Sequence, residues 1–332
     1  MTAVAVLGAG SWGTALANHL AGAGADVVIW SHDPEVARAI NSLHQNPLYL
    51  PGAHLAPSLR ATASAADAVR GRPVIVSVSP SQTVRSVLAP LADAAQPDAV
   101  VIGASKGIET SSLKRMSEVC AEALPNRPYV ILSGPSFAEE VVEKQPTAVV
   151  AASASAAAAT LAQQLFSTST FRVYTSGDVT GTELAGSFKN VIAIAAGMLD
   201  GLGLGNNPRA ALITRGLAEI TRLGAAMGAD PRTFAGLAGV GDLVLTTCGT
   251  LSRNRALGVA LGTGQTLAEF SATNRSVVEG VYTARVAMQL SVSTGVEMPI
   301  AAKVAECLFD GKPPRQAIAE LMERTPKPEQ WT

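Results

Sequence analysis

The sequence predicts an α/β protein in which a doubly wound sheet at the N-terminus is followed by an all-helical C-terminal domain. Up to about residue 180, short apolar runs alternate with helical patterns, as expected for strands joined by crossover helices. Beyond that point the strand-like runs stop, and the helical patterns lie at 182–199, 208–228, 252–262, 279–292, 297–309 and 314–324. We therefore expect residues 1–180 to form one domain and residues 181–332 to form a second.

The chain begins with an apolar run, a glycine-rich turn and a helical pattern. The run is Ala3–Leu7, and the turn has the pattern GxGxxG, with Gly8, Gly10, Ser11, Trp12 and Gly13. Glycines at these positions let the backbone turn tightly and approach a pyrophosphate, while the helix N-terminus offers N–H groups and a positive dipole. Because a second strand-like run follows at Asp26–Trp30, we expect a dinucleotide-binding, Rossmann-like domain. The alternative is a glycine-rich turn that binds nothing.

The residues after the second strand bear on the choice of cofactor. An acid at this position binds the ribose 2′-hydroxyl of NAD, whereas a cation beside open space suits the 2′-phosphate of NADP. If the strand ends at Trp30, Ser31 takes the position with His32 beside it, which favours NADP(H); Asp33 there would favour NAD(H). Asp33 and Pro34 are also suited to begin a helix, as N-cap and first helical residue, and both interpretations can hold together.

Further strand-like runs predict the rest of the sheet. They lie at Pro73–Ser79, Ala99–Ser105, Tyr129–Gly134, Thr147–Ala152 and Phe171–Tyr174, with helical patterns at Ser64–Arg70, Thr83–Ala94, Ser112–Ala123 and Ala154–Phe166. Ligands of such sheets lie beyond the carboxyl ends of the strands. Lys106 is therefore a candidate for an anionic substrate, and Gly134 and Ser136 lie in the turn after another strand. The alternatives are a surface lysine and an ordinary glycine-proline turn.

The helical domain contains a lysine in apolar surroundings, which is the main catalytic candidate. Within Thr182–Gly205, apolar residues at three- and four-residue spacing predict a helix that carries Lys189 and Asn190 inward, with Gly197 at its end. Loss of hydration lowers the pKa of an ammonium group toward neutral pH, which suits proton exchange with a substrate hydroxyl or carbonyl. The alternative is a lysine with a buried stem whose charged end reaches water.

Two further segments of this domain carry candidate polar groups. Ser252 is suited to cap a helix whose first turn contains Arg253 and Asn254. Cations at a positive helix end are favourable when an anion such as phosphate binds there. Asp242 lies among apolar residues, where its carboxylate can orient Lys189 or hold a substrate hydroxyl. The alternatives are arginines directed at solvent and Asp242 as a helix cap.

Composition limits the class of protein. The formal net charge is −1 and no long Lys/Arg run occurs, so neither nucleic acid nor an anionic membrane surface is favoured as a partner. The three cysteines are widely spaced and odd in number, which suits reduced thiols, and they lack the spacing of a metal site. Neither a signal peptide nor a membrane span is evident. We expect a cytoplasmic protein without a metal.

The chain resembles NAD(P)-dependent glycerol-3-phosphate dehydrogenases of the bacterial type. The resemblance rests on seven motifs in this order: GAGSWGTALA, SKGIE, SGPSFAEE, FKNVIAIAAGMLDGLGLGNN, ALITRGL, GVGDLVLT and SRNR. It extends over essentially the whole chain. It implies reversible reduction of dihydroxyacetone phosphate to sn-glycerol 3-phosphate with NADP(H) or NAD(H), which supplies glycerophospholipid synthesis, in a homodimer.

The resemblance also implies a role for each site residue. The lysine of the KN pair, the family's proton donor and acceptor, corresponds to Lys189. Cofactor contacts fall on Ser11, Trp12, His32, Lys106, Ala138, Arg253 and Glu279, beside Gly8, Gly10 and Gly13. Substrate contacts fall on Lys106, Gly134, Ser136, Lys189, Asp242, Ser252, Arg253 and Asn254. Ser187 and Phe188 depart from the Ala or Thr and the aliphatic residue usual before this lysine, which leaves the packing beside it open.

Two other functions are weighed against this one. A different β-hydroxyacid-type dehydrogenase, for example one acting on a sugar acid, would need a site for a carboxylate in place of a phosphate. A dinucleotide sensor without turnover would need no acid/base group. The combination of Lys189, Asp242 and Arg253 argues against the sensor.

Overall fold

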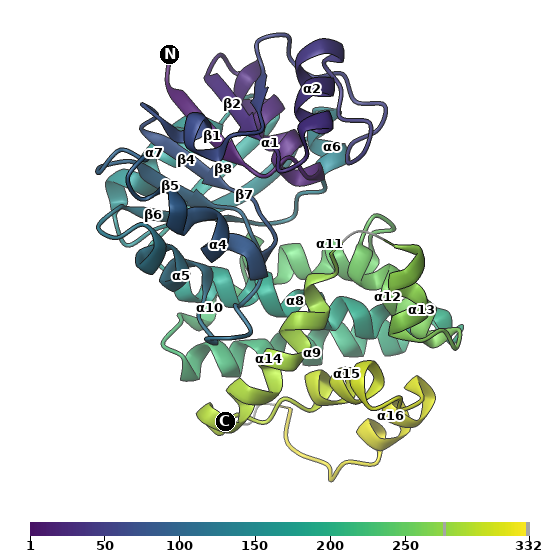
Figure 1. Ribbon diagram of the computed structural model, residues 1–332. Coiled ribbons are helices and arrows are strands. Elements are labelled where there is room, and N and C mark those ends of the chain that lie inside the picture. The colour runs from purple at the N-terminus through teal and green to yellow at the C-terminus, as the bar shows by residue number, and fades with distance from the viewer. Residues whose placement is uncertain (275–276, 330–332) are drawn as a thin grey trace. The chain divides into compact units, whose positions relative to one another are not determined.

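The computed structural model describes residues 1–274 and 277–329. They fall into two compact units. The sheet unit comprises Met1–Glu109 and Lys114–Val179, and the helical unit comprises Thr110–Leu113 and Thr180–Thr332. In Figure 1 the colour of the chain runs from purple through teal in the sheet unit and onward to yellow in the helical unit.

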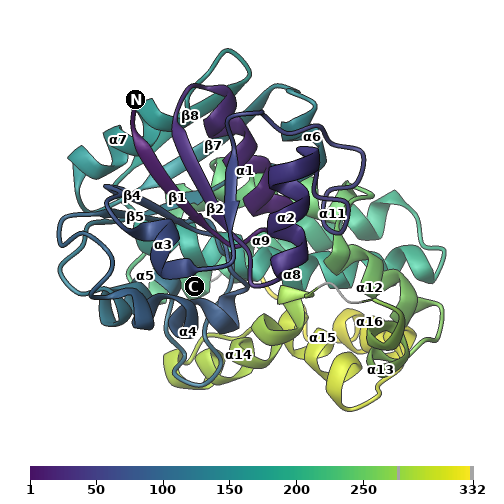
Figure 2. The ribbon, with the colours of Figure 1, turned by 45° about the horizontal axis from the view of Figure 1, so that its top comes forward.

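The sheet unit is built on eight strands in the order β3-β2-β1-β4-β5-β6-β7-β8. They are β1 (Ala3–Leu7), β2 (Asp26–Trp30), β3 (Arg60–Thr62), β4 (Val74–Ser77), β5 (Val100–Gly103), β6 (Tyr129–Ser133), β7 (Thr147–Ala152) and β8 (Phe171–Ser176). Neighbours are parallel except β6 and β7. Figure 2 shows several of these strands side by side. The chain adds β2 and β3 on one side of β1 and then continues with β4 on the other side. This reversal of the strand order between β1 and β4 is a topological switch point, where ligands of such sheets bind.

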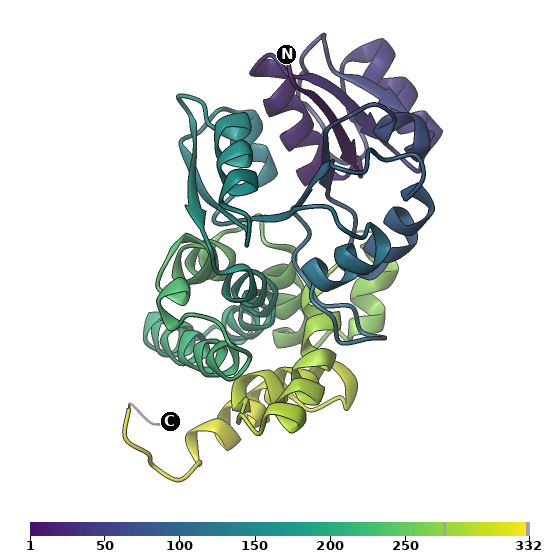
Figure 3. The ribbon, with the colours of Figure 1, turned by 90° about the vertical axis from the view of Figure 1, so that its left-hand side faces the viewer.

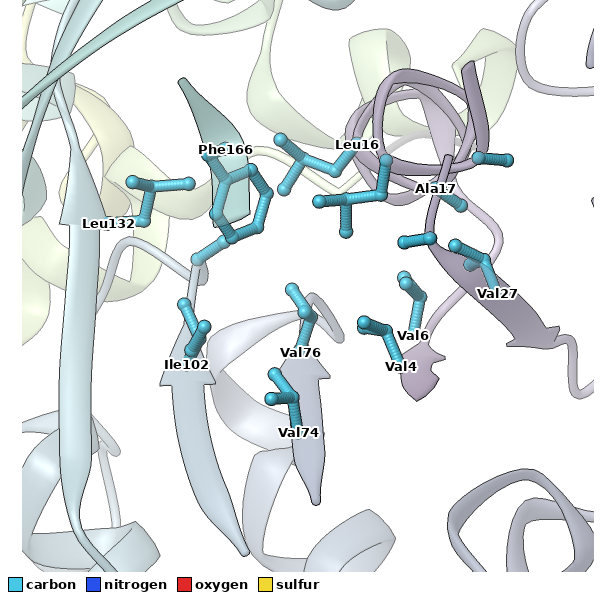
Figure 4. Packing of buried hydrophobic residues seen from close by; sticks show 14 of the residues in the cluster. Val4, Val6, Leu16, Ala17, Val27, Val74, Val76, Ile102, Leu132 and Phe166 are labelled. Carbon is cyan, nitrogen blue, oxygen red and sulfur yellow. The ribbon is translucent and has the colours of Figure 1, made fainter. Parts of the chain in front are cut away.

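Helices follow most of the strands and cover both faces of the sheet. They are α1 (Ser11–Gly22), α2 (Pro34–Leu43), α3 (Ala65–Val69), α4 (Val84–Leu88), α5 (Met116–Ala123), α6 (Ala138–Val142) and α7 (Ala156–Phe166). Alternate residues of β1 enter different cores: Val4 and Val6 pack with Leu16 of α1, as in Figure 4, whereas Ala5 and Leu7 join the opposite cluster. Burial on both faces explains the continuous apolar runs of the sequence and confirms the predicted doubly wound sheet.

The helix expected at Ser112–Ala123 begins later than predicted. It starts at Met116, because Ile108 and Arg115 form an isolated β-bridge and the N–H of Glu109 donates to the carbonyl of Lys114. The segment Thr110–Leu113 between them belongs to the helical unit. The strand β3 is absent from the sequence prediction.

The described residues of the helical unit form helices joined by turns and loops and contain no strand, and Figure 3 shows much of this unit as the green and yellow ribbon. Its helices are α8 (Val179–Gly201), α9 (Asn206–Ala226), α10 (Pro231–Phe234), α11 (Asp242–Cys248), α12 (Arg253–Gly262), α13 (Leu267–Thr273), α14 (Glu279–Thr294), α15 (Pro299–Phe309) and α16 (Pro314–Met322). This confirms the predicted all-α character. The helix predicted at 182–199 is α8, which ends at Gly201, and Gly197 lies inside this helix and does not open its end.

One carboxylate is buried inside the helical unit. Glu219 of α9 accepts hydrogen bonds from the backbone N–H groups of Ile300, at 2.9 Å, and Ala301, at 3.0 Å, in the first turn of α15. Glu219 therefore supplies the N-terminal cap of another helix. Burial raises the pKa of Glu219 to about 7, against the lowering effect of these two N–H groups and of the charges of Arg222 and Arg324.

The described residues contain no single helix that is long and apolar enough to cross a membrane. Pro231–Cys248 and Arg253–Gly262, which meet at a bend of 48°, reach the required length and composition only as a pair.

Candidate functional site

The three glycines after β1 have different structural roles. Gly8 has φ of +120°, and a Cβ there would lie 3.1 Å from the carbonyl carbon of Val78. A Cβ at Gly13 would lie 1.8 Å from the carbonyl oxygen of Gly8, so α1 packs directly on the turn. At Gly10 nothing lies within 4 Å of the Cβ position, and no side chain caps α1 there. Two glycines thus close the turn and the third leaves space for a pyrophosphate, which fits a dinucleotide.

A loop between α2 and β3 braces this glycine turn. Asn46 is fully buried, and its Nδ2 donates to the carbonyl of Ala9 at 2.9 Å and to Oγ1 of Thr14 at 2.8 Å. The hydroxyl of Ser11 donates to the carbonyl of Tyr49 in the same loop. Asn46 was missed in the sequence because a single asparagine in an irregular segment carries no periodic signal.

Two of the expected cofactor contacts meet the same loop through apolar packing. Trp12, half-buried at the start of α1, and Ala138, the first residue of α6, pack in one small cluster with Ala15 and Leu50. The structure therefore brings together the glycine turn, Trp12 and Ala138 within the sheet unit.

Beyond the end of β2, the carboxylate of Asp33 caps the N-terminus of α2. Asp33 is the N-cap of α2 and accepts from the N–H of Glu35 at 2.9 Å, with Pro34 as the first helical residue. Ser31 is buried, and its Oγ accepts from the N–H of Asp33 at 3.1 Å. His32 is exposed beside them. The helix-start interpretation is confirmed, and His32 is the exposed side chain between Ser31 and Asp33.

The turns after β5 and β6 also come together. Nζ of Lys106 donates to the carbonyl of Gly134 at 3.1 Å, and Oγ of Ser136 donates to the same oxygen at 3.0 Å. Gly134 has φ of +141°, and a Cβ there would lie 2.9 Å from the Cα of Val149, so this position requires glycine. The carbonyl oxygen of Gly134 thus brings Lys106 and Ser136 together with Gly134. These are the three sheet-unit residues expected to contact the substrate.

Lys189 of α8 is buried and held by two polar groups. Its ammonium forms an ion pair with Oδ1 of Asp242, and it donates to Oγ1 of Thr246 at 2.7 Å. The exposed fraction of the side chain is 8% for Lys189 and 1% for Asp242, so the alternative of a charged end in water is wrong. Apolar residues such as Leu217 and Phe234 line the void beside the lysine stem. The surroundings are therefore not purely apolar as expected, because a carboxylate offsets the cost of burying the ammonium.

Local backbone geometry places Asp242 at this position. A π-helical turn at Leu237–Gly241 leads directly into α11, whose first residue is Asp242. Gly239 permits the tight turn, because a Cβ there would lie 2.0 Å from the carbonyl oxygen of Phe234. Thr246 lies one helical turn after Asp242 and donates to its carbonyl at 2.7 Å, so both groups face Lys189 from one side of α11. The side chain of Asp242 holds the lysine and is not a helix cap.

The residues expected to bind an anion lie in the first turn of α12. Oγ of Ser252 caps the helix by accepting from the N–H of Arg255, and Arg255 donates to Asp200 of α8 at 2.7 Å. Arg253 is exposed and has no ion-pair partner among residues 1–274 and 277–329. The idea that both arginines face solvent is therefore wrong for Arg255, whose charge is neutralised, and holds for Arg253.

Asn254 links three helices of the helical unit. Its Nδ2 donates to Oδ1 of Asn190 on α8 at 2.9 Å, and its Oδ1 accepts from the N–H of Gly280 on α14 at 2.9 Å. Glu279, an expected cofactor contact, is the first residue of α14. Asn254 therefore ties the residue beside Lys189 to the start of the helix that carries Glu279.

The described residues contain no group of three or more His, Cys, Asp or Glu side chains that could hold a metal ion. Cys120, Cys248 and Cys307 are free thiols.

Comparison with known proteins fits these features. The family model described as NAD-dependent glycerol-3-phosphate dehydrogenase N-terminus matches residues 3–159, and the corresponding C-terminus model matches residues 178–319. The glycerol-3-phosphate dehydrogenase (NAD(P)+) of Geobacter sulfurreducens is 55% identical over 331 residues, which is 99% of each chain. The chain belongs to the NAD(P)-dependent glycerol-3-phosphate dehydrogenase family.

Solved structures agree with membership of the glycerol-3-phosphate dehydrogenase family. A crystal structure of glycerol-3-phosphate dehydrogenase from Coxiella burnetii is 38% identical, covers 97% of this chain and 99% of its own, and superposes with a TM-score of 0.94. A ketopantoate reductase from Ralstonia eutropha, 13% identical with a TM-score of 0.60, shares the fold alone. The family accounts for an NAD(P) cofactor, which the glycine turn fits.

Proposed function

We propose that this chain catalyses the reversible, NAD(P)H-dependent reduction of dihydroxyacetone phosphate to sn-glycerol 3-phosphate, as its membership of the glycerol-3-phosphate dehydrogenase family suggests. The observation that carries the proposal is the buried ion pair of Lys189 with Asp242, beside the hydroxyl of Thr246. An acid/base group with a fixed orientation is what a carbonyl reduction needs, and neither a sensor nor a structural protein needs one.

The bound nicotinamide supplies the hydride, and the residues of the chain supply binding, orientation and a proton. In the reducing direction, the ammonium of Lys189 donates a proton to the C2 oxygen of the ketone and stabilises the negative charge that develops on it. Asp242 and Thr246 hold Nζ in place. The carboxylate of Asp242 is nearly inaccessible to water, so it stabilises the ammonium form of Lys189. The ammonium then holds the proton that passes to the substrate.

The phosphate of the substrate is assigned to two groups of cations. In the helical unit, Arg253 lies exposed in the first turn of α12, where the backbone N–H groups and the helix dipole add to its charge. In the sheet unit, Lys106 lies with Gly134 and Ser136. Glu279, which the resemblance places at the cofactor, directly precedes Gly280, whose N–H is held by Asn254.

We further propose that residues 1–180 bind the dinucleotide and residues 181–332 carry the catalytic lysine. NADP(H) is the proposed preferred cofactor, because the carboxylate of Asp33 is used as a helix cap and His32 is exposed beside it. A cytoplasmic homodimer that supplies glycerol 3-phosphate for glycerophospholipid synthesis is consistent with free thiols and a net charge of −1. Gel filtration with light scattering would test the dimer.

The decisive experiment compares substrates that differ only in their charged group. NADPH oxidation is measured with dihydroxyacetone phosphate and with unphosphorylated dihydroxyacetone, and NADP⁺ reduction is measured with glycerol 3-phosphate and with a sugar acid. Several charge-assisted hydrogen bonds of roughly 1.5–3 kcal/mol each should favour the phosphorylated ketone by about 10³ or more in kcat/KM. Arg253→Ala should remove much of this preference, and Arg253→Lys, which keeps the charge, should retain a larger part of it.

Two results would reject the assignment. One is equal turnover of dihydroxyacetone and its phosphate, and the other is a preference for the sugar acid, which would favour a different β-hydroxyacid dehydrogenase. Since Arg253 is also an expected cofactor contact, KM for NADPH is measured for each variant.

A further inference from the structure

The helices α8 and α12 approach each other backbone to backbone. A Cβ at Gly197 of α8 would lie 2.0 Å from the carbonyl oxygen of Arg255, and one at Gly258 of α12 would lie 2.0 Å from the carbonyl oxygen of Ile194. One turn further along each helix, Gly201 and Gly262 repeat the pattern, with distances of 2.4 and 2.6 Å to carbonyl oxygens of the partner helix. Glycine at these four positions is therefore required for the two helices to lie as close as they do.

The contacts also fix the register of the two helices. Asn190 and Asn254 are hydrogen-bonded at a separation of 64 positions. The two glycine pairs that face each other, Gly197 with Gly258 and Gly201 with Gly262, are each separated by 61 positions. The helices thus run side by side in the same direction, and Lys189 of α8 and Arg253 of α12 both lie on the N-terminal side of the crossing.

We propose that the glycine crossing of α8 and α12 is a positioning element that sets the distance between the proton-donating Lys189 and the phosphate-binding Arg253, with Gly258 as its central positioning residue. The inference rests on the proposed function, because it assigns the phosphate to Arg253. The spacing between the proton donor and the anion site then selects ketones whose phosphate lies at the right distance from the carbonyl.

The crossing suits this role because it has little freedom to yield. Side chains at a helix contact can change rotamer, whereas carbonyl groups facing glycine Cα atoms cannot. Two side-chain links join the same two helices, Asn254 with Asn190 and Arg255 with Asp200. Lys189 itself is held by Asp242 and Thr246 on α11, so its own partners do not depend on the glycines.

The test is to widen the crossing by one methyl group. In Gly258→Ala, the distance from Cβ to the carbonyl of Ile194 must grow from 2.0 Å to more than 3.0 Å, so α12 must move by about 1 Å. A misplacement of about 1 Å can cost about 10²-fold in rate. Gly262→Ala, where the clash is milder at 2.6 Å, should cost about tenfold or less. Gly205→Ala is the matched control, because nothing lies within 4 Å of its Cβ position.

The expected result separates positioning from mere stability. Gly258→Ala should lower kcat/KM for dihydroxyacetone phosphate by about 100-fold, leave turnover of dihydroxyacetone within about twofold and leave the pH profile of kcat unchanged. Circular dichroism and the melting temperature report whether each variant is folded. If Gly258→Ala does not fold, the milder Gly262→Ala must show the same selective loss, in smaller measure.

Three outcomes would overturn the inference. They are a folded Gly258→Ala enzyme with unchanged preference for the phosphate, an equal loss on both ketones, and a loss in the Gly205→Ala control as large as that in Gly258→Ala. The Arg253→Ala comparison separates failure of the inference from failure of the proposed function. If Arg253→Ala removes the phosphate preference and Gly258→Ala does not, only the inference fails; if Arg253→Ala has no effect, both fail.

Discussion

Replacing Asp242 by asparagine removes the charge that holds Lys189 and keeps the size of the side chain. With exposed side-chain fractions of 8% and 1%, the two groups are screened little by water. Removing one partner of such a pair leaves a buried charge, which typically costs about 3–5 kcal/mol. We expect Asp242→Asn to lower the free energy of unfolding by about 3 kcal/mol and to lower kcat, because Nζ loses its fixed position.

A double-mutant cycle isolates the interaction. Lys189→Met removes the proton donor and should lower kcat by about 10³ or more, since proton transfer and charge stabilisation are both lost. In the double variant no buried charge lacks a partner, so the free energy of unfolding should recover by about 2 kcal/mol relative to Asp242→Asn. Activity should not recover.

Urea unfolding followed by circular dichroism measures the stability of the four proteins, and NADPH absorbance measures kcat with dihydroxyacetone phosphate. Asp230→Asn is the matched control, because Asp230 pairs with Arg232 at the surface and its loss should change stability little. The reasoning is refuted if the effects of Asp242→Asn and Lys189→Met on stability add to within about 0.5 kcal/mol. It is also refuted if folded Lys189→Met keeps more than about a tenth of the kcat of the wild type.

Two further predictions concern cofactor choice and pH. His32→Ala should lower kcat/KM for NADPH more than for NADH, because His32 is the exposed side chain beside the capped end of β2; a strong NADH preference that the substitution leaves unchanged would contradict this. The raised pKa of Glu219, about 7, means that the folded protein binds this proton more tightly than the unfolded chain, so the stabilisation present below about pH 4.5 is lost as pH rises to 7. Relative to Glu219→Gln, the wild type should therefore lose about 3 kcal/mol between pH 4.5 and 7.5 in urea unfolding, and parallel pH profiles would exclude this role.

Much of the sheet could be predicted because its strands are buried on both faces. Val130, Ile131 and Leu132 of β6 are all buried and apolar for that reason, so the strand is visible in the sequence as a continuous apolar run. The strand β3 gives no such signal, because it has three residues, lies at the sheet edge and begins with the exposed Arg60. The short helices α11 and α13 were missed likewise, since seven residues hold too few turns for a periodic pattern.

Gly197 shows where a local rule fails for a tertiary reason. Glycine near the end of a helical pattern usually marks the C-terminus, because it accepts a left-handed backbone. In this chain Gly197 lies inside α8 and serves the close approach of α12. A single sequence cannot distinguish these roles, because the residue that would clash with a Cβ, Arg255, lies far along the chain on another helix.

The environment of Lys189 shows the corresponding limit for the site. Helical periodicity indicates that the lysine points inward, but the groups that meet it lie 53 and 57 positions away, on α11. Asp242 was considered as a partner because a carboxylate among apolar residues needs one, whereas Thr246 carries no charge and was not considered. The buried carboxylate favours the ammonium over the neutral amine. In the proposed reaction Lys189 gives its proton to the ketone, and in the reverse direction the same nitrogen must be the neutral amine before it can accept the proton of the glycerol 3-phosphate hydroxyl. That asymmetry predicts that the oxidative reaction gains more than the reductive one as pH rises, and it follows from the pair with Asp242, which the helical pattern alone does not reveal.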